Sequence, residues 1–129
     1  ALELTMDDTQ KPLVYACSGR SNVAQLANDI AVVMDREGHA EMSCIAGVGG
    51  DIPSLVKVAK SGRDICAIDG CALACVKHSL ARHGVTPKWH IELTTKGIKK
   101  RNHEGCSIQE HYEVLRSVYN ELGIIATGE

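Results

Sequence analysis

The stretch that decides the fold reads Asp64-Ile65-Cys66-Ala67-Ile68-Asp69-Gly70-Cys71-Ala72-Leu73-Ala74-Cys75. Its first part is a short apolar run without helical periodicity, which predicts a strand buried on both faces. The residues from Cys71 to His83 are good helix formers and stop at Gly84, so they predict a helix. Cys71 and Cys75 would then share one face of its first turns, where unpaired backbone N–H groups favour thiolates.

The rest of the chain repeats this order of strand followed by helix. Each predicted strand is a short apolar run, and each helix opens at a capping residue or proline and shows apolar residues at helical spacing. The predicted strands are 13–17, 40–45, 64–68 and 88–93, and the predicted helices are 21–37, 52–60, 71–83 and 107–122. In the last helix, a capping box at Ser107 and Glu110 begins the helix. Its predicted buried stripe is Ile108, Tyr112, Leu115, Tyr119 and Leu122.

Alternating strands and helices predict an α/β domain with three layers, in which helices cover both faces of a parallel sheet. We expect a flavodoxin- or Rossmann-like sheet of four strands in the order 2-1-3-4, with a ligand crevice at the carboxyl ends of the strands. Residues 12–125 would form this single domain. Residues 1–11 are polar, lack periodicity and predict a flexible tail.

Composition narrows the class of protein. The formal net charge is −2, which gives no electrostatic drive toward nucleic acid or membranes. No run approaches a transmembrane helix, and the N-terminus lacks the pattern of a signal peptide, so we expect a soluble cytoplasmic protein. In a reducing compartment, six cysteines indicate metal ligands or redox groups rather than disulfides.

The cysteines recur at equal intervals. Cys17, Cys44 and Cys71 are each 27 residues apart, and each closes or follows a predicted strand. Three βα units of equal length return the chain to the same edge of the sheet, so we expect these sulfurs to gather there with Cys75. Four thiolates are a zinc ligand set. Cys66 lies within a predicted strand, so we expect it to be a core residue. We expect Cys106 to be a spare, solvent-exposed thiol.

The sequence also resembles the DGC-domain family, whose members are described as zinc-binding proteins. The resemblance covers nearly everything from Leu13 to Arg101. It rests on Cys17-Ser18-Gly19, Ser21-Asn22-Val23, Gln25-Leu26-Ala27-Asn28, Met42-Ser43-Cys44, Ala46-Gly47-Val48-Gly49-Gly50, Ala67-Ile68-Asp69-Gly70-Cys71, Ala74-Cys75 and Gly97-Ile98-Lys99-Lys100. The resemblance implies zinc ligands at Cys17, Cys44, Cys71 and Cys75, and it implies no particular reaction.

Other chemistries fit the same thiols. A thiol-based enzyme could use Cys17 or Cys71 for persulfide transfer or disulfide exchange, with Asp69 as a helix cap, a partner of a metal ligand or a base. An iron–sulfur cluster could occupy the four cysteines. Arg20 could hold a small anion, and a sulfur species is a possible partner of the thiols. A basic run at Lys96, Lys99, Lys100 and Arg101 is typical of a solvated loop, but it could also offset the charge of a thiolate site.

Overall fold

The computed structural model describes residues 11–124 and has the predicted parallel sheet of four strands, in the order β2-β1-β3-β4. The predicted N-terminal tail, apart from Lys11, lies outside the described residues. The last residue of the predicted domain, residue 125, also lies outside them. The elements are β1 Leu13–Ala16, α1 Asn22–Arg36, β2 Glu41–Met42, α2 Ile45–Gly49, α3 Pro53–Ala59, β3 Ile65–Asp69, α4 Cys75–Ala81, β4 Trp89–Glu92, the 3₁₀ helix η1 Leu93–Lys96 and α5 Ile108–Leu122.

The two central strands are buried along their whole length. Every residue of β1 and β3 is buried, and Leu13 to Ala16 pair in register with Ile65 to Ile68. Their unbroken apolar sequences follow from this position, since a central parallel strand is covered on both faces. The edge strands β2 and β4 are partly exposed and more polar.

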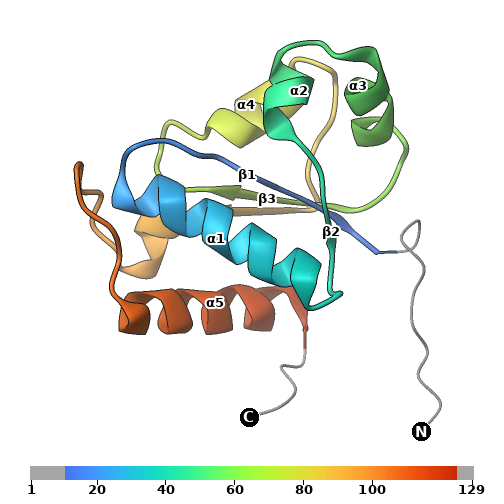
Figure 1. Ribbon diagram of the computed structural model, residues 1–129. Coiled ribbons are helices and arrows are strands. Elements are labelled where there is room, and N and C mark those ends of the chain that lie inside the picture. The colour runs from blue at the N-terminus through green and yellow to red at the C-terminus, as the bar shows by residue number, and fades with distance from the viewer. Residues whose placement is uncertain (1–10, 125–129) are drawn as a thin grey trace, which may run out of the picture.

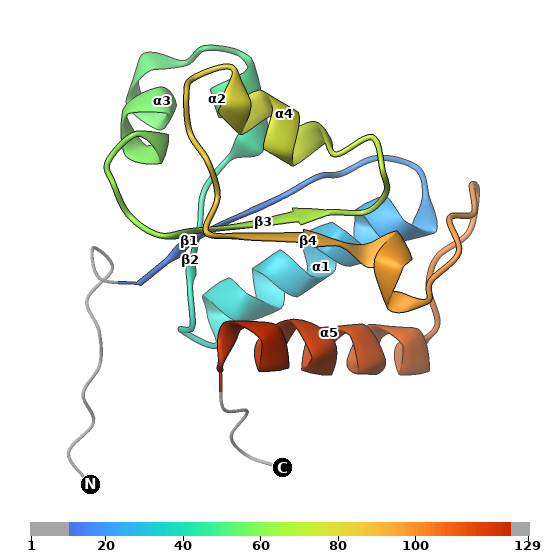
Figure 2. The same cartoon turned by 180° about the vertical axis from the view of Figure 1, so that it is seen from behind.

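Helices cover both faces of the sheet and make a three-layer α/β fold. Figures 1 and 2 show α1 and α5 side by side on one face, and α2, α3 and α4 on the other. Within residues 11–124, no helix is long and apolar enough to cross a membrane.

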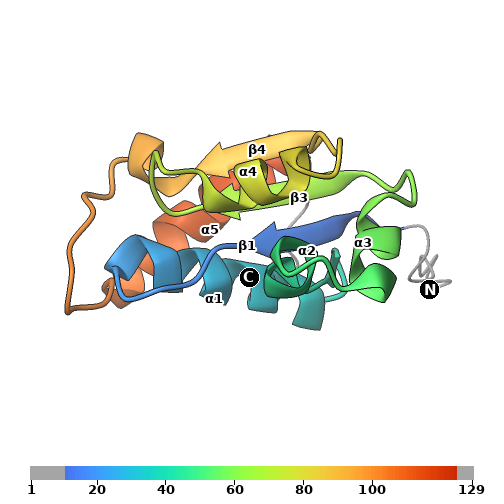
Figure 3. The same ribbon diagram turned by 90° about the horizontal axis from the view of Figure 1, so that it is seen from above.

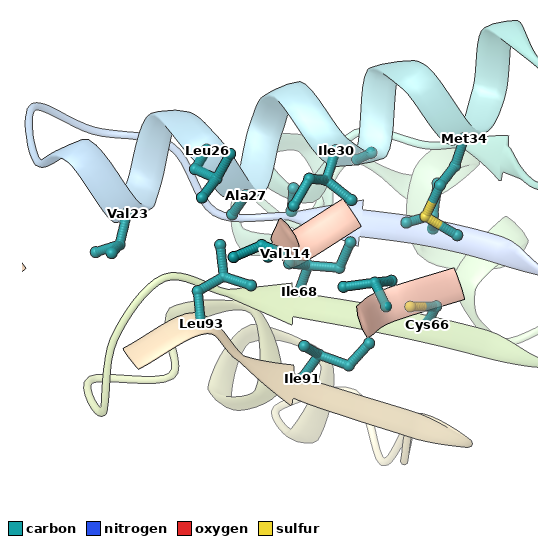
Figure 4. Close-up of a cluster of buried hydrophobic side chains, with 14 of the residues drawn as sticks. Val23, Leu26, Ala27, Ile30, Met34, Cys66, Ile68, Ile91, Leu93 and Val114 are labelled. Atoms are coloured by element: carbon teal, nitrogen blue, oxygen red, sulfur yellow. The ribbon is translucent and has the colours of Figure 1, made fainter. Parts of the chain in front are cut away.

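A separate apolar core fills each face. The larger core packs α1 and α5 against the sheet, and Figure 4 shows Ala27, Ile30 and Met34 on the side of α1 that faces Cys66 and Ile68 of β3. Cys66 lies in this core and is fully buried, as predicted. The smaller core joins Tyr15 of β1 to Val76 and Leu80 of α4 and to Val48 of α2.

The structure corrects two predicted segments. The predicted strand over 40–45 is only Glu41–Met42, and a short helix that was not predicted, α2, begins at Ile45 and includes Gly47 and Gly49. Gly47 lies against Leu55 of α3, whose side chain would be 2.0 Å from a Cβ at that position. The glycines of α2 therefore permit close helix packing despite their low helix propensity.

The predicted buried stripe of the last helix is also wrong in part. The capping box at Ser107 and Glu110 is present and begins α5 as expected. However, α5 buries Val114, Val118 and Tyr119, whereas Ile108 and Tyr112 are exposed. The helix has apolar residues on two faces, and tertiary packing selects the one that carries the β-branched residues.

Candidate functional site

The cysteines predicted to share one edge of the sheet do follow strands at its carboxyl edge. Cys17 follows β1 directly, Cys44 lies two residues after β2, and Cys71 lies two residues after β3. Figure 3 shows the arrowheads of β1, β3 and β4 pointing to the same side of the molecule. Cys17 and Cys71 are partly buried, whereas Cys44 and Cys75 are exposed.

The turn at Asp69-Gly70-Cys71 is built tightly against the start of α1. The Gly70 N–H donates a hydrogen bond to Cys17 Sγ at 3.1 Å, and the Gly70 carbonyl accepts one from the Thr94 N–H at 3.2 Å. A Cβ on Gly70 would lie 2.7 Å from the carbonyl carbon of Val23 and 2.8 Å from the nitrogen of Ala24. Only glycine lets the turn approach α1 this closely and place its N–H on the Cys17 sulfur.

Asp69 is a buried carboxylate with three donors. It is 1% exposed, and it accepts hydrogen bonds from the Val76 N–H at 2.8 Å and the Lys77 N–H at 3.2 Å, in the first turn of α4. The third donor is His90 Nε2 of β4, at 2.8 Å. These contacts support the predicted capping role of Asp69. They also reveal His90, which sequence spacing did not bring to this site.

Helix α4 begins later than predicted. It starts at Cys75, because its cap residue Ala74 has a left-handed conformation with φ 51° and interrupts the helix. Cys71 therefore lies in the preceding turn, and the predicted shared helix face of Cys71 and Cys75 is wrong. Asp69 accepts hydrogen bonds from the Val76 and Lys77 N–H groups, and these bonds fix the start of the helix. They outweigh the helix propensity of residues 71–74.

The basic segment after β4 lies over this edge, held by Asn22. The Asn22 side chain is fully buried, donates to the Lys99 carbonyl at 3.0 Å and accepts from the Arg101 N–H at 2.6 Å. The segment then places Lys100 Nζ 3.5 Å from Cys71 Sγ. Cys106, expected to be solvent-exposed, is instead partly buried, and its sulfur lies 3.6 Å from the Asn22 side-chain nitrogen.

Cys44 lies near a buried hydroxyl that lacks a good partner. Tyr15 is fully buried, and its hydroxyl makes no hydrogen bond of acceptable geometry. Burial raises the pKa of Tyr15, the nearby Ser43 side chain opposes that rise, and Cys44 adds to it. Sequence analysis gave no sign of this contact, because Tyr15 reads simply as a core residue of β1.

Burial controls the chemistry of Cys17. It raises the pKa of the Cys17 thiol to about 11, and the Gly70 N–H opposes the rise while Asp69, Cys75 and Cys71 add to it. Cys71 and Cys75 are thus close enough to affect Cys17, which is almost wholly protonated at neutral pH. A protonated thiol is a poor nucleophile, and Cys17 would have to lose its proton to bind a metal ion.

The four cysteines share an edge without forming a closed site. Among residues 11–124, no three or more His, Cys, Asp or Glu side chains are arranged to hold a metal ion. The set of sulfur donors is chemically suited to zinc, but the sulfur atoms would have to draw together to coordinate one.

Comparison with known proteins identifies the family of this chain. Residues 13–118 match the DGC domain. The chain belongs to the DGC-domain family. It is 62% identical over 103 residues to a Pseudomonas aeruginosa protein named anaerobic and virulence modulator AnvM, covering 80% of this chain and 79% of that protein. No solved structure matches the chain. The resemblance expected from sequence is thus confirmed.

Alkylation of the metal-free, reduced DGC protein should rank its thiols by exposure and pKa. We expect Cys44 and Cys75 to react fastest, because both are exposed. Cys17 and Cys66 should react slowest, because burial raises their pKa values to about 11 and about 12, and the rate at Cys17 should climb as the pH rises toward that value. Peptide mass spectrometry after timed quenching measures each rate. Fastest reaction at Cys17 would contradict this picture and favour a nucleophilic role for it.

Proposed function

We propose that this DGC protein binds zinc through Cys17, Cys44, Cys71 and Cys75, and that it uses the site for regulation rather than for a chemical reaction. The observation that carries the proposal is the contact of the Gly70 N–H with Cys17 Sγ. It joins a thiol at the end of β1 to the turn that bears Cys71 and leads to Cys75. This contact would bring two of the four proposed ligands, Cys17 and Cys71, toward one place.

Two neighbouring groups support a cluster of thiolates here. The Lys100 ammonium beside Cys71 would offset part of the charge that four thiolates place on one zinc ion. The Tyr15 hydroxyl near Cys44 is a buried donor that a zinc-bound thiolate could satisfy. Zinc would supply positive charge and hold the strand ends together, while these residues would tune and orient the ligands.

The regulatory part of the proposal rests on the name of the relative and on the three hydrogen bonds that Asp69 accepts. The relative is named an anaerobic and virulence modulator, and we extend a regulatory role to this chain. Asp69 already accepts three hydrogen bonds, which leaves it poorly placed to act as a base.

A thiol-based enzyme is the second candidate, and one contact favours it. A cation beside Cys71 could hold an anionic sulfur species at that residue, as in persulfide transfer. The predicted small-anion partner would then approach at Lys100 rather than at Arg20. The raised pKa of Cys17 makes Cys71 the better nucleophile candidate in this reading.

Metal analysis of site variants tests the zinc proposal. Protein purified without an affinity tag or added metal should contain about one zinc per chain. Each of Cys17→Ser, Cys44→Ser, Cys71→Ser and Cys75→Ser should lose most of the zinc and lower the melting temperature of the metal-loaded protein. Cys106→Ser is the matched control, and it should keep the zinc content and the melting temperature of the wild type. This cysteine contacts Asn22 instead of the turn.

Other outcomes separate the alternatives. Bound iron with visible absorbance would replace zinc with an iron–sulfur centre. Absence of metal, with zinc affinity unchanged in Cys71→Ser, would contradict a cysteine metal site. Transfer of the outer sulfur of an added small-molecule persulfide to the Cys71 thiolate of the metal-free protein, with release of the donor's thiol and with loss of transfer in Lys100→Ala, would favour the enzyme.

A further inference from the structure

Helix α5 has a second apolar face that the described residues, 11–124, leave uncovered. Ile108 is 77% exposed and Tyr112 is 65% exposed, while Leu115 beside them is partly buried. These positions recur at helical spacing and form one stripe. Figures 1 and 2 show α5 as an outer helix, with no other helix or strand of residues 11–124 on its side away from the sheet. The other large exposed apolar residues in the described chain, Ile52 and Leu73, lie on separate elements.

The surface around Ile108 and Tyr112 has the shape of a ridge between two hollows. One hollow, of about 490 Å³, continues to Val33 of α1 and to Cys106 and Leu115. The other, of about 480 Å³, continues to Gln109, Glu113 and Arg116. Both hollows include the two ridge side chains. A surface with a ridge and an adjoining groove can pack against a copy of itself.

The charged residues beside the ridge would also complement those of a second copy of the chain. Glu113 accepts a hydrogen bond from the neutral Gln109 side chain at 3.0 Å. Arg116 is exposed, and in the part of the chain that the structure describes no ion pair engages it. One acid and one base thus lie a turn apart on the same edge of α5. Rotation by a two-fold axis would bring each beside its opposite in a second molecule.

We propose that this face binds a second copy of the chain, with the two α5 helices antiparallel and crossing between Tyr112 and Leu115. The Ile108 and Tyr112 ridge of each copy lies in the hollow beside the ridge of the other. Glu113 of one copy pairs with Arg116 of the second copy, and the reverse. Such a contact is isologous, so it closes at a dimer and leaves no further apolar stripe of α5 to recruit a third copy.

Sedimentation equilibrium of the full chain tests the dimer. The buffer contains a reductant and a chelator, because exposed Cys44 and Cys75 could otherwise link two chains by a disulfide or a shared metal. We expect a reversible monomer–dimer equilibrium. Tyr112→Glu should weaken it by about 30-fold or more, since a buried charge replaces a central aromatic contact. Leu73→Glu is the control, an equally exposed apolar residue elsewhere, and should leave association unchanged.

A charge exchange then tests the antiparallel arrangement. Glu113→Arg and Arg116→Glu should each weaken the dimer by about 5-fold or more, because each places like charges together at both ends of the contact. The double variant should recover most of the lost affinity. All these residues are exposed, and circular dichroism verifies that each variant is folded. A chain that stays monomeric at every concentration overturns the proposal, and so does a dimer that Tyr112→Glu leaves unchanged. Single charge variants without effect, or a double variant without recovery, overturn the antiparallel arrangement.

Discussion

Replacing Gly70 with alanine is expected to lower the free energy of unfolding by about 3 kcal/mol, because the new methyl group would overlap backbone rather than a movable side chain. Its Cβ would lie 2.7 to 2.8 Å from the backbone atoms of Val23 and Ala24. Relief requires the turn and the start of α1 to separate, which also breaks the hydrogen bond from the Gly70 N–H to Cys17. Thermal unfolding should show a melting temperature lower by roughly 10 to 20 °C.

Gly105→Ala is the matched control for this substitution. Nothing lies within 4 Å of a Cβ built on Gly105, and its backbone has no positive φ. Alanine there should change the free energy of unfolding by less than about 0.5 kcal/mol. Equal effects of the two substitutions would show that the close approach of the turn to α1 contributes little to stability.

Replacing Asp69 with alanine should also cost about 3 kcal/mol, because one buried and two partly buried donors lose their acceptor at once. These donors are the Val76 and Lys77 N–H groups and His90 Nε2. Asp69→Asn should cost less, since its side-chain oxygen can still accept from the first turn of α4. Urea unfolding curves would give the order wild type, Asp69→Asn, Asp69→Ala in decreasing stability.

Two further variants separate the contacts of Asp69. His90→Ala should be milder than Asp69→Ala, because the backbone N–H groups keep their acceptor. Asp29→Ala is the surface control, since Asp29 is an exposed residue of α1. A loss of stability at Asp29 as large as that at Asp69 would contradict a specific role for the buried carboxylate.

The sheet order and the shared edge of the cysteine segments could be predicted because both depend on chain order alone. Alternating strands and helices return the chain to the same edge after each crossover, and right-handed crossovers favour the order 2-1-3-4. Cys17, Cys44 and Cys71 are placed at that edge by their spacing. How closely the sulfurs meet depends on turn geometry, which spacing does not encode.

The predictions from sequence failed where a tertiary contact outweighed the local preference of the chain for a helix or for a buried helix face. Residues 71–74 are suited to a helix, but the Asp69 carboxylate fixes the start of α4 at Cys75. Helix α5 offers two apolar faces, and only packing against the sheet shows that Val114 and Val118 are covered while Ile108 and Tyr112 are not. His90 shows the same limit. Its strand was predicted, but its pairing with Asp69 required the register of β3 and β4.

The position of β1 between β2 and β3 has a consequence for biosynthesis. During synthesis from the N-terminus, β1 emerges early, but its hydrogen bonds to β3 cannot form until Ile65 to Ile68 have left the ribosome. The sulfur of Cys17 meets the Gly70 N–H only at that stage. These pairings are distant in sequence, and such contacts close slowly in folding. Cys17 therefore remains an unshielded thiol on the nascent chain until Gly70 has also been made and has left the ribosome, and a ligand that needs both segments can bind only after that point.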